Sequence, residues 1–476
     1  MRVLFVVRDI YLFERFGIMH ISSMLKTHGH EVEIARALTE DLHAKVASFK
    51  PHILAYSLTT GFHQYYLDIN RDIRKRYDAL SVFGGPHPTF FPDIVKEDGV
   101  DIVCIGEGEL PMLDLADALK SGRPVENIEN LIVKTASGIK ENPTRPLIEN
   151  LDALPFPDRD LVYDKSPAFK NMKVKAFFSG RGCPYQCSYC FNHRYNELFR
   201  GKGKVIRKRS VDNLLQEIAD VKSRYPLEVV RFMDDVFILG GKPWLEEFSK
   251  KYKKEVGLPF VCMTRADLID EDVVKMLKEA GCHSVYMAIE AANDRVRNEL
   301  LKRNLNKDRM LRSSRLFHEH GIKIVAENIL GLPSETIEDM LETLRLNIQY
   351  KIDLAIASIF NPYPGTELAD FAAEKGYFTG DYDKIDYSFF GDSPLNFTRS
   401  QKKKIRNLSS LFNVTVSIPV LFPLVKLLIH LPSNRVFKFI GEIWHGYCLK
   451  FRIFPHRMTF KENMRMILLF FKRNEE

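Results

Sequence analysis

The chain has 476 residues and a net charge of +7, with 45 % apolar and 28 % charged residues. This length suggests about three domains at roughly 150 residues each, and the balanced composition excludes a disordered, collagen-like or heavily membrane-embedded protein. The seven cysteines are too sparse for a disulfide scaffold, and the first apolar run is too short for a signal peptide. We therefore expect a globular protein of the reducing cytoplasm, where clustered thiols bind metals and isolated ones pack in cores.

Residues 1–125 alternate short β-like runs with amphipathic stretches, which predicts a doubly wound parallel sheet. The expected strands are Val3–Val7, Val32–Ala35, His52–Ser57, Leu80–Phe83 and Asp101–Ile105. Ligands of such sheets bind beyond the carboxyl ends of the strands. Small or polar residues stand at those ends, namely Ser57, Thr59, Gly84, Gly85, Gly106 and Glu107. Taken singly, each of them is also an ordinary turn residue.

Residues 126–172 read as a connector, with a short hairpin at Leu131–Lys134 followed by an extended, proline-rich linker. A second alternation of strands and helices fills residues 173–395. Its expected strands are Ala176–Ser179, Val229–Met233, Phe260–Thr264, Ser284–Ile289, Lys323–Asn328 and Leu354–Phe360. Six such units predict an incomplete (β/α)6 barrel, with its active site at the carboxyl ends of the strands.

One motif in this barrel has the spacing of a metal centre. Cys183, Cys187 and Cys190 form C-x-x-x-C-x-x-C directly after the first barrel strand. Three thiolates on one loop can hold three irons of a 4Fe–4S cluster and leave the fourth iron open to a ligand. A zinc site with His193 as fourth ligand is the alternative, although structural zinc sites use paired ligand spacings.

This loop, with Tyr189 before the last cysteine, resembles the signature of the radical S-adenosylmethionine (SAM) superfamily. The resemblance implies that the open iron chelates the amino and carboxylate groups of SAM. It also implies that the reduced cluster cleaves SAM to a 5′-deoxyadenosyl radical. A reducing partner such as flavodoxin or ferredoxin would then supply the electron.

Further positions in the barrel resemble the SAM contacts of this superfamily. Asp234 and Asp235 match the segment that meets the methionine amino group, and Glu290 matches the ribose-contacting glutamate. Arg265 matches a position beside the cofactor, and the segment from Glu327 through Gly331 matches the adenine side. Structural alternatives remain open: helix capping for the aspartates, an ion pair for Arg265, and for Gly331 a turn before a helix that begins at Ser334.

The N-terminal half resembles the cobalamin-binding subfamily of these enzymes. The segments that carry the likeness are Phe83–Thr89, Ile105–Glu109 and Leu151–Asp160. The fingerprint D-x-H-x-x-G, whose histidine ligates cobalt, is absent, because Asp9 to Glu14 contains no histidine. We therefore expect cobalamin without a histidine ligand from this loop; a relative that has lost the corrin is the alternative.

The resemblance implies methylation of an unactivated carbon through a 5′-deoxyadenosyl radical and methylcobalamin. An oxidative cyclase of the porphyrin-ester type, or another rearrangement that uses the same cofactors, is the alternative within the family. Methylthio transfer fits less well, because only Cys104 lies in the N-terminal domain. A non-catalytic iron–sulfur or cobalamin sensor or carrier is the alternative from another class.

The region 396–476 lies outside the resemblance and is expected to be mainly helical. From Gln401 onward it holds fourteen Lys and Arg against four Asp and Glu, a net charge of +10, so the first 400 residues carry −3. Its basic and aromatic residues suit peripheral contact with the inner membrane surface, which would make a lipid-like small molecule an attractive substrate. An accessory domain with ordinary apolar packing is equally compatible. No nucleic-acid motif accompanies the charge.

Overall fold

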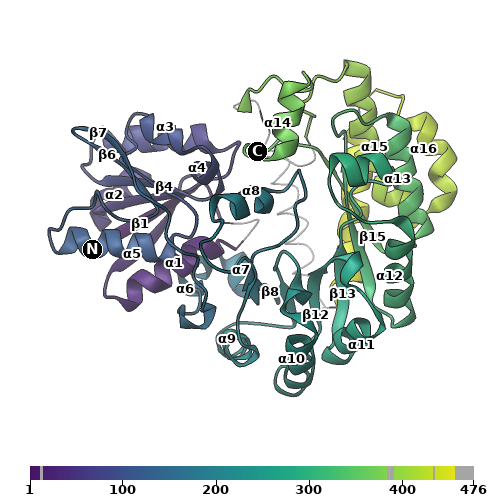
Figure 1. Cartoon of the computed structure of the whole chain (residues 1–476), viewed down its shortest axis with the longest axis horizontal. Coiled ribbons are helices and arrows are strands. Elements are labelled where there is room, and N and C mark those ends of the chain that lie inside the picture. Colours follow the sequence, from purple (N-terminus) through teal and green to yellow (C-terminus); the bar gives the residue numbers. More distant parts are fainter. Residues whose placement is uncertain (11–13, 383–384, 386–390, 433–434, 456–476) are drawn as a thin grey trace.

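The computed structural model describes residues 1–10, 14–382, 385, 391–432 and 435–455. Two sheets lie side by side, with helix α8 (Phe191–Leu198) between them and the C-terminal helices on the far side of the second sheet (Figure 1). The expectations for residues 11–13, within the loop after the first strand, and for residues 456–476 of the C-terminal region fall outside the described residues.

The first sheet has the strand order β2-β1-β3-β4-β5-β6-β7. Its strands are β1 (Arg2–Val7), β2 (Glu31–Arg36), β3 (Ile53–Ser57), β4 (Leu80–Gly84), β5 (Ile102–Cys104), β6 (Leu131–Thr135) and β7 (Gly138–Glu141). Its helices are α1 (Phe16–Thr27), α2 (Leu42–Phe49), α3 (His63–Arg74), α4 (Pro86–Phe90) and α5 (Glu109–Lys120). Apolar side chains of both faces are buried in two separate clusters, so helices cover the sheet on both sides. This confirms the doubly wound fold.

The predicted hairpin belongs to this sheet. Strands β1 to β5 are parallel, whereas β6 pairs with β5, and β7 with β6, in antiparallel fashion. The hairpin covers the edge strand β5, which would otherwise offer unpaired backbone groups to other chains. The rest of the connector is less extended than expected, because it forms the short helices α6 (Arg159–Tyr163) and α7 (Pro167–Asn171).

The second sheet has six parallel strands in the order β15-β14-β13-β12-β11-β8, as expected for an incomplete barrel. Its strands are β8 (Val174–Phe177), β11 (Val229–Phe232), β12 (Phe260–Thr264), β13 (Cys282–Met287), β14 (Lys323–Leu330) and β15 (Leu354–Ile359). The helices of this region are α9 (Val211–Arg224), α10 (Gly241–Glu255), α11 (Glu271–Ala280), α12 (Lys307–Glu319), α13 (Ile337–Gln349) and α14 (Glu367–Glu374). A short hairpin, β9 (Gly180–Arg181) with β10 (Arg207–Lys208), follows β8 and was not predicted.

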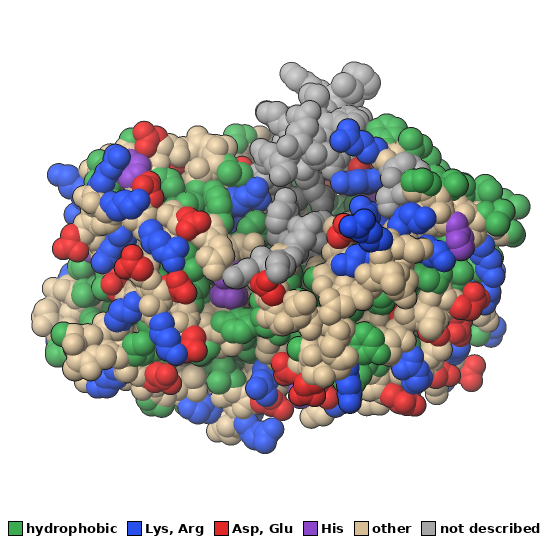
Figure 2. Space-filling model, turned by 90° about the horizontal axis from the view of Figure 1, so that it is seen from above, with side chains coloured by type: hydrophobic (Ala, Val, Ile, Leu, Met, Phe, Trp, Pro, Cys, Tyr) green, Lys and Arg blue, Asp and Glu red, His purple; other side chains and the backbone are tan. Residues whose placement is uncertain are grey.

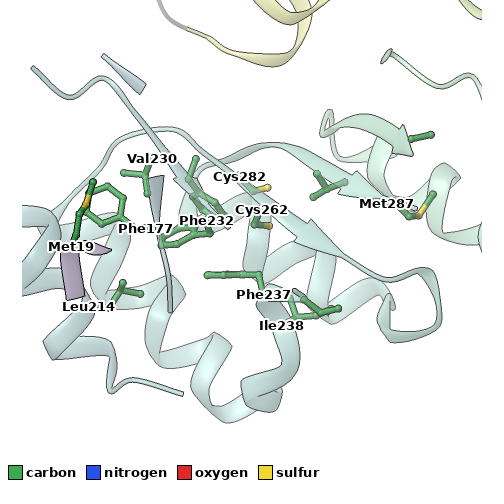
Figure 3. Close-up of a cluster of buried hydrophobic side chains, with 14 of the residues drawn as sticks. Met19, Phe177, Leu214, Val230, Phe232, Phe237, Ile238, Cys262, Cys282 and Met287 are labelled. Atoms are coloured by element: carbon green, nitrogen blue, oxygen red, sulfur yellow. The ribbon is translucent and has the colours of Figure 1, made fainter. Parts of the chain in front are cut away.

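One face of the second sheet packs on its helices through an aromatic core. Phe177, Phe232 and Phe237 lie together there, with Cys262 and Cys282 beside them (Figure 3). The phenyl rings of Phe232 and Phe237 stack at 4.6 Å between centroids. All four isolated cysteines are buried, which confirms that they are packing residues.

The C-terminal region is helical, as expected, with α15 (Arg399–Ser417), α16 (Phe422–Leu428) and α17 (Arg435–Cys448), followed by a π-helical turn, Leu449–Ile453. Cys448 and Ile453 pack against the other face of the second sheet, near the amino ends of its strands. Ser284 Oγ on β13 donates a hydrogen bond to the carbonyl of Ile453 at 3.0 Å. None of the helices in the described ranges is both long enough and apolar enough to cross a bilayer.

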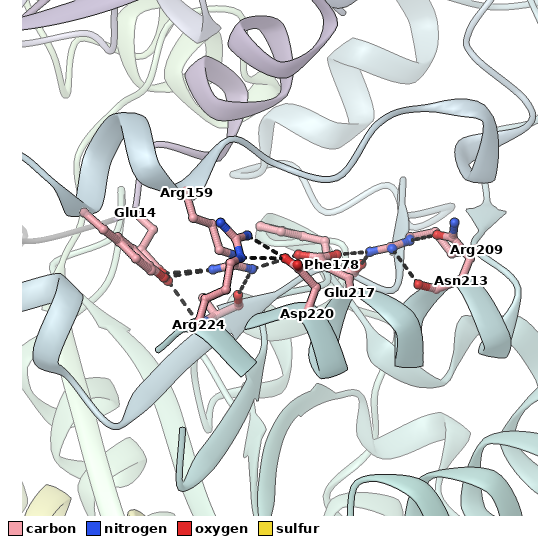
Figure 4. Close-up of polar contacts among 10 residues, drawn as sticks. Glu14, Arg159, Phe178, Arg209, Asn213, Glu217, Asp220 and Arg224 are labelled. Atoms are coloured by element: carbon pink, nitrogen blue, oxygen red, sulfur yellow. Dashed lines mark hydrogen bonds and ion pairs between the residues drawn. The ribbon is translucent and has the colours of Figure 1, made fainter. Parts of the chain in front are cut away.

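A buried ion-pair network joins the two halves of the molecule through the connector. Arg159, 1 % exposed, binds Glu217 of α9 at 2.8 Å and Glu14 of the N-terminal half at 3.2 Å (Figure 4). Arg209 also binds Glu217. Because each buried carboxylate faces a guanidinium, the charges compensate one another inside the protein.

Candidate active site at the junction of the two sheets

The cysteine loop lies at the carboxyl end of β8 and leads directly into α8. Cys190 is the residue that precedes the first turn of α8, so the partly positive amino end of that helix stands beside the thiols. The loop approaches the turn before β10 so closely that a Cβ atom on Gly182 would lie 1.9 Å from the Val205 carbonyl oxygen, and Gly182 has a φ of +92°. Only glycine fits this position.

The three thiols lie close enough to influence one another electrostatically. Burial raises the pKa of Cys183 to about 11 and that of Cys190 to about 12, with further contributions from Cys187. Arg265 Nη1 lies 3.7 Å from Cys187 Sγ. Desolvated thiolates need nearby positive charge, which iron ions supply, so the loop fits a cluster. His193, considered as a zinc ligand, instead faces the carboxylates of Glu197 and Glu367 at 3.8 Å each.

Arg265 forms the ion pair that was one of its two expected roles, and it also contacts the cysteine loop. Besides its contact with Cys187, its Nε lies 2.8 Å from Asp267 Oδ1, and its guanidinium stacks 3.7 Å from the ring centroid of Tyr185. Tyr185 lies within the cysteine loop. Arg265 therefore fixes one side of that loop while it presents positive charge to a cysteine sulfur.

Tyr189 ties the cysteine loop to the end of β13. Its hydroxyl donates to Glu290 Oε1 at 2.7 Å and accepts a bond from Arg303 Nη1 at 3.0 Å. Glu290 is 6 % exposed, burial raises its pKa, and its φ of +63° is unusual for a residue with a side chain. Such backbone strain concentrates at functional sites. The sequence reasoning missed Arg303, for which only the adjacent basic pair Lys302-Arg303 gave a signal.

The two neighbouring aspartates after β11 have different environments, and neither caps a helix. Asp234 is buried and accepts bonds from the backbone and hydroxyl of Ser179 at 3.1 and 2.6 Å, with Lys208 Nζ at 3.5 Å. Asp235 is exposed and accepts one bond from Asn192 of α8 at 2.9 Å. Loss of hydration beside the surrounding protein raises the pKa of Asp235, and the negative charge of Asp234 raises it further, whereas the bond from Asn192 lowers it. Asp235 also raises the pKa values of Cys183 and Cys190, so it lies near the cysteine loop.

The segment from Glu327 to Glu335 begins on the second sheet and continues to the contact with the C-terminal helix α15. Glu327 lies on β14, and burial and then Glu290 raise its pKa to about 7. Gly331 faces the tail, since a Cβ atom there would lie 3.3 Å from Ile405 of α15. The alternative in which the next helix begins at Ser334 is wrong, because Pro333 and Ser334 form a turn and the helix begins later. Thr336 caps α13 through a reciprocal bond pair with Asp339, and this arrangement satisfies the free N–H groups at the helix start.

A cavity of about 290 Å³ opens at the carboxyl ends of the first sheet. Five of the six residues predicted there contribute to its lining, namely Ser57, Gly84, Gly85, Gly106 and Glu107. Thr59 is exposed elsewhere. Gly85 brings the β4 end against β3, because a Cβ atom on it would lie 2.9 Å from both backbone N and O of Leu58.

The cavity and the cysteine loop are joined by ion pairs. Glu107 Oε1 binds Arg181 at 2.9 Å and Arg207 at 2.7 Å, and Arg181 also binds Glu109 at 2.5 Å. Arg181 precedes the first cysteine by two residues and lines the cavity as well. The carboxylate of Glu107 is therefore engaged between the two halves of the molecule. The sequence reasoning missed Arg181, whose only signal was its place in the cysteine motif.

Comparison with known proteins agrees with this geometry. The family model of the radical SAM superfamily matches residues 177–346, and that of the B12 binding domain matches residues 7–116. The chain is 31 % identical over 368 residues to an uncharacterized methyltransferase of Pyrococcus horikoshii, covering 75 % of this chain and 78 % of that protein. It is 26 % identical over 372 residues to the anaerobic magnesium-protoporphyrin IX monomethyl ester cyclase of Rubrivivax gelatinosus, covering 74 % and 65 % of the two chains.

A solved structure shares the fold. The radical SAM methyltransferase TsrM of Kitasatospora setae, with cobalamin and a [4Fe-4S] cluster bound, superposes with a TM-score of 0.66. It is 18 % identical in sequence, and the match covers 84 % of this chain and 80 % of TsrM. Together with the site described above, these matches establish that the chain belongs to the cobalamin-dependent radical SAM methyltransferase family, which has the anaerobic cyclases as relatives.

Proposed function

We propose that the chain methylates an unactivated carbon of a small molecule, with a 4Fe–4S cluster, SAM and cobalamin as cofactors. When bound, these groups supply a 5′-deoxyadenosyl radical and a methyl group. The observation that supports this best is the Arg181–Glu107 contact, which places the cysteine loop beside the cavity of the first sheet. Two reactive groups held in one protein at a fixed geometry gain the advantage of proximity.

The residues of the chain have separable tasks in this proposal. Cys183, Cys187 and Cys190 hold three irons, and Arg265 supports the loop from the side of Cys187. The Glu290 carboxylate accepts hydrogen bonds from the ribose hydroxyls of SAM. Tyr189 holds this carboxylate in place, and Arg303 in turn donates to the Tyr189 hydroxyl. The reducing partner is a one-electron donor such as flavodoxin or ferredoxin.

Anaerobic reconstitution tests the proposed function. The protein is supplied with iron, sulfide and hydroxocobalamin, desalted, and analysed for iron and cobalt before SAM and dithionite are added. We expect about four irons per chain, retained cobalt, and formation of 5′-deoxyadenosine. Iron and 5′-deoxyadenosine without cobalt would leave a radical enzyme that does not transfer methyl groups through cobalt. A non-catalytic sensor would form no 5′-deoxyadenosine.

Of the two aspartates, we propose that Asp235 is the acceptor that binds the methionine amino group of SAM. Asp235→Asn removes a charged acceptor that Ser179 and Lys208 do not use, so SAM affinity should fall about tenfold with little change in stability. Asp234→Asn is the matched variant. It leaves Lys208 buried without its carboxylate, which should lower the free energy of unfolding by about 3 kcal/mol.

Equilibrium dialysis with SAM and urea denaturation of the reconstituted variants measure these two effects. Equal SAM affinity in wild type and Asp235→Asn would refute the assignment. A loss of SAM binding confined to Asp234→Asn would transfer it to the other aspartate.

We further propose that the tail binds the inner surface of the membrane. Helices α16 and α17 and the flanking turns carry an apolar patch on the outside of the molecule, at the right-hand end of Figure 2, next to Lys and Arg side chains. The patch consists of Val420, Leu424, Leu427, Leu431, Val436, Ile440, Ile443, Tyr447 and Phe451. From Gln401 onward the chain carries fourteen Lys and Arg against four Asp and Glu. Apolar side chains can insert into the lipid surface while neighbouring cations bind anionic headgroups. A protein bound in this way would have access to a lipid-like substrate in the membrane.

Two patch residues offer a direct test. Val420 is 80 % and Leu427 is 70 % exposed, so Val420→Asp/Leu427→Asp should leave stability nearly unchanged. It should weaken binding to vesicles of phosphatidylcholine and phosphatidylglycerol about tenfold or more. Flotation measures this, and Leu38→Asp, a substitution at an exposed leucine of the N-terminal half, is the control. Wild-type protein that stays at the bottom of the gradient, or equal flotation of all three proteins, would disprove membrane binding.

A further inference from the structure

The chain that leads into α15 and the first turns of that helix carry a concentrated positive charge. From residue 392 to residue 406 there are five Lys and Arg against one Asp, a net charge of +4. Cations are unfavourable at the amino end of a helix, because the helix dipole is positive there, so helix stability does not account for them. Four of them are spaced three or four positions apart and share one face of α15. We call this the basic face, and it consists of Arg399, Lys402, Lys403 and Arg406.

Protein groups neutralise little of the charge on the basic face. Arg406 forms an ion pair with Asp392 at 2.8 Å, and Lys403 Nζ donates to the carbonyl of His430 at 2.8 Å. Within the part of the chain that the structure describes, the side chains of Arg399 and Lys402 form no ion pair and no hydrogen bond. Four cations against one carboxylate leave a net charge of +3 on this face, and a surface of one sign attracts ligands of the opposite charge.

One edge of the basic face lies beside the barrel mouth, by which we mean the carboxyl ends of the strands of the second sheet. Gly331 directly follows β14 at this mouth. A Cβ atom on Gly331 would lie 3.3 Å from Ile405 Cδ1 and 3.7 Å from the ring of Phe397. Ile405 precedes Arg406, and Phe397 stands two residues before Arg399. A ligand of the basic face is therefore held at the edge of the barrel mouth.

The other edge of the basic face meets the apolar patch. Asn407, which follows Arg406, donates from Nδ2 to the carbonyl of Leu431 at 2.9 Å, and Leu431 is an exposed member of that patch. Lys403 contacts the neighbouring residue, His430. Figure 2 shows Lys and Arg side chains next to the hydrophobic side chains at the right-hand end of the molecule. One continuous surface thus runs from the barrel mouth over the basic face to exposed apolar side chains.

We infer that the basic face binds the headgroup of the substrate, and that this substrate is a membrane lipid with a terminal phosphate. A phosphomonoester carries a charge of about −1.5 to −2 at pH 7 and three acceptor oxygens, so it suits several cations better than a singly charged phosphodiester. Arg399 can bind two phosphate oxygens at once, and Lys402 adds a second charge. The headgroup is thereby anchored at the barrel mouth. This inference rests on the proposed function and on its membrane-bound tail.

Flotation of the purified full chain with two kinds of vesicle tests the inference. Phosphatidic acid has a terminal phosphate, whereas phosphatidylglycerol is a phosphodiester, and each is mixed into phosphatidylcholine at the same molar fraction. We expect wild-type protein to bind the phosphatidic acid vesicles at least about fivefold more tightly. Arg399→Gln/Lys402→Gln should weaken this binding about tenfold and remove the preference. Lys253→Gln/Lys254→Gln is the matched control, because it removes the same charge from exposed positions of α10, and it should change binding less than about twofold.

A second readout is independent of affinity. Phosphatidic acid vesicles should protect Lys402 from acetylation, measured by mass spectrometry, and should leave Lys253 reactive. Equal reactivity of Lys402 with and without these vesicles would overturn the inference. Binding of soluble glycerol phosphate, measured by calorimetry, distinguishes a lipid from a soluble phosphomonoester. If it binds as tightly as the phosphatidic acid vesicles, the substrate is not a membrane lipid.

The remaining outcomes separate this inference from the proposals on which it rests. Equal binding of wild type to both kinds of vesicle, or equal losses in Arg399→Gln/Lys402→Gln and the α10 control, would overturn the inference while membrane binding by the tail stands. Wild-type protein that binds neither kind of vesicle would overturn the inference and the membrane contact together. Formation of 5′-deoxyadenosine by reconstituted protein tests the radical chemistry separately from all of these results.

Discussion

Protein in which Cys183, Cys187 and Cys190 are all replaced by alanine is expected to retain no cluster iron and to form no detectable 5′-deoxyadenosine from SAM. The three thiols are the loop's metal ligands in our proposal, and the remaining four cysteines are buried among apolar side chains. Cobalamin binding should persist, since its cavity belongs to the first sheet. Iron analysis, the absorbance spectrum and chromatography of the reaction measure the three quantities.

The control for this experiment is a buried cysteine outside the loop. Cys104→Ala removes a thiol from the wall of the first cavity, and we expect it to keep both iron and 5′-deoxyadenosine formation. Retained iron in the triple variant would contradict the assignment of the cluster to this loop. Loss of cobalamin together with iron would indicate that the variant has not folded, which circular dichroism checks separately.

The second large effect concerns stability. Arg159→Met is expected to lower the free energy of unfolding by about 3–5 kcal/mol, because it leaves Glu14 beside the buried Glu217 without their shared guanidinium. Although Arg209 still binds Glu217, Glu14 and the Ala176 carbonyl lose a buried donor. Urea denaturation followed by circular dichroism measures the change.

Arg224 provides a matched comparison in the same region (Figure 4). Its ion pairs with Asp160 and Asp220 lie at the surface, with the Arg224 side chain 37 % exposed. Arg224→Met should therefore change the free energy of unfolding by less than about 1 kcal/mol. Similar effects of the two substitutions would mean that the Arg159 network does not hold the two halves of the molecule together.

Much of the architecture could be predicted from the sequence. The predicted strands of both sheets agree with the observed ones within two residues at each end. Strands such as Ile53–Ser57 and Phe260–Thr264 are short, nearly continuous apolar runs, and such runs are the signature of parallel strands buried on both faces. The signal is local, so no knowledge of distant contacts was needed. The antiparallel addition of β6 and β7 was not visible, because the sequence of a hairpin does not specify which edge it joins.

Helix boundaries were less predictable where two candidate caps compete. Ser334 and Thr336 are both good residues for a helix start. Thr336 has Asp339 three residues later, which completes the reciprocal pair, whereas Ser334 adopts a φ of +61° outside the helix. The position of the helix start therefore depended on Asp339, which the sequence contains but which the prediction did not take into account.

The sequence by itself determined the cysteine loop, the two α/β units and the isolated packing cysteines, because each depends on residue spacing or apolar runs within a short stretch. Only the tertiary structure decided that Asp234 is buried against Ser179 while Asp235 is exposed and accepts a bond from Asn192, since two adjacent carboxylates differ only in what folds against them. It likewise decided that Arg181 meets Glu107, 74 residues away. Contacts between distant segments follow from packing geometry, which leaves no periodic trace in the sequence.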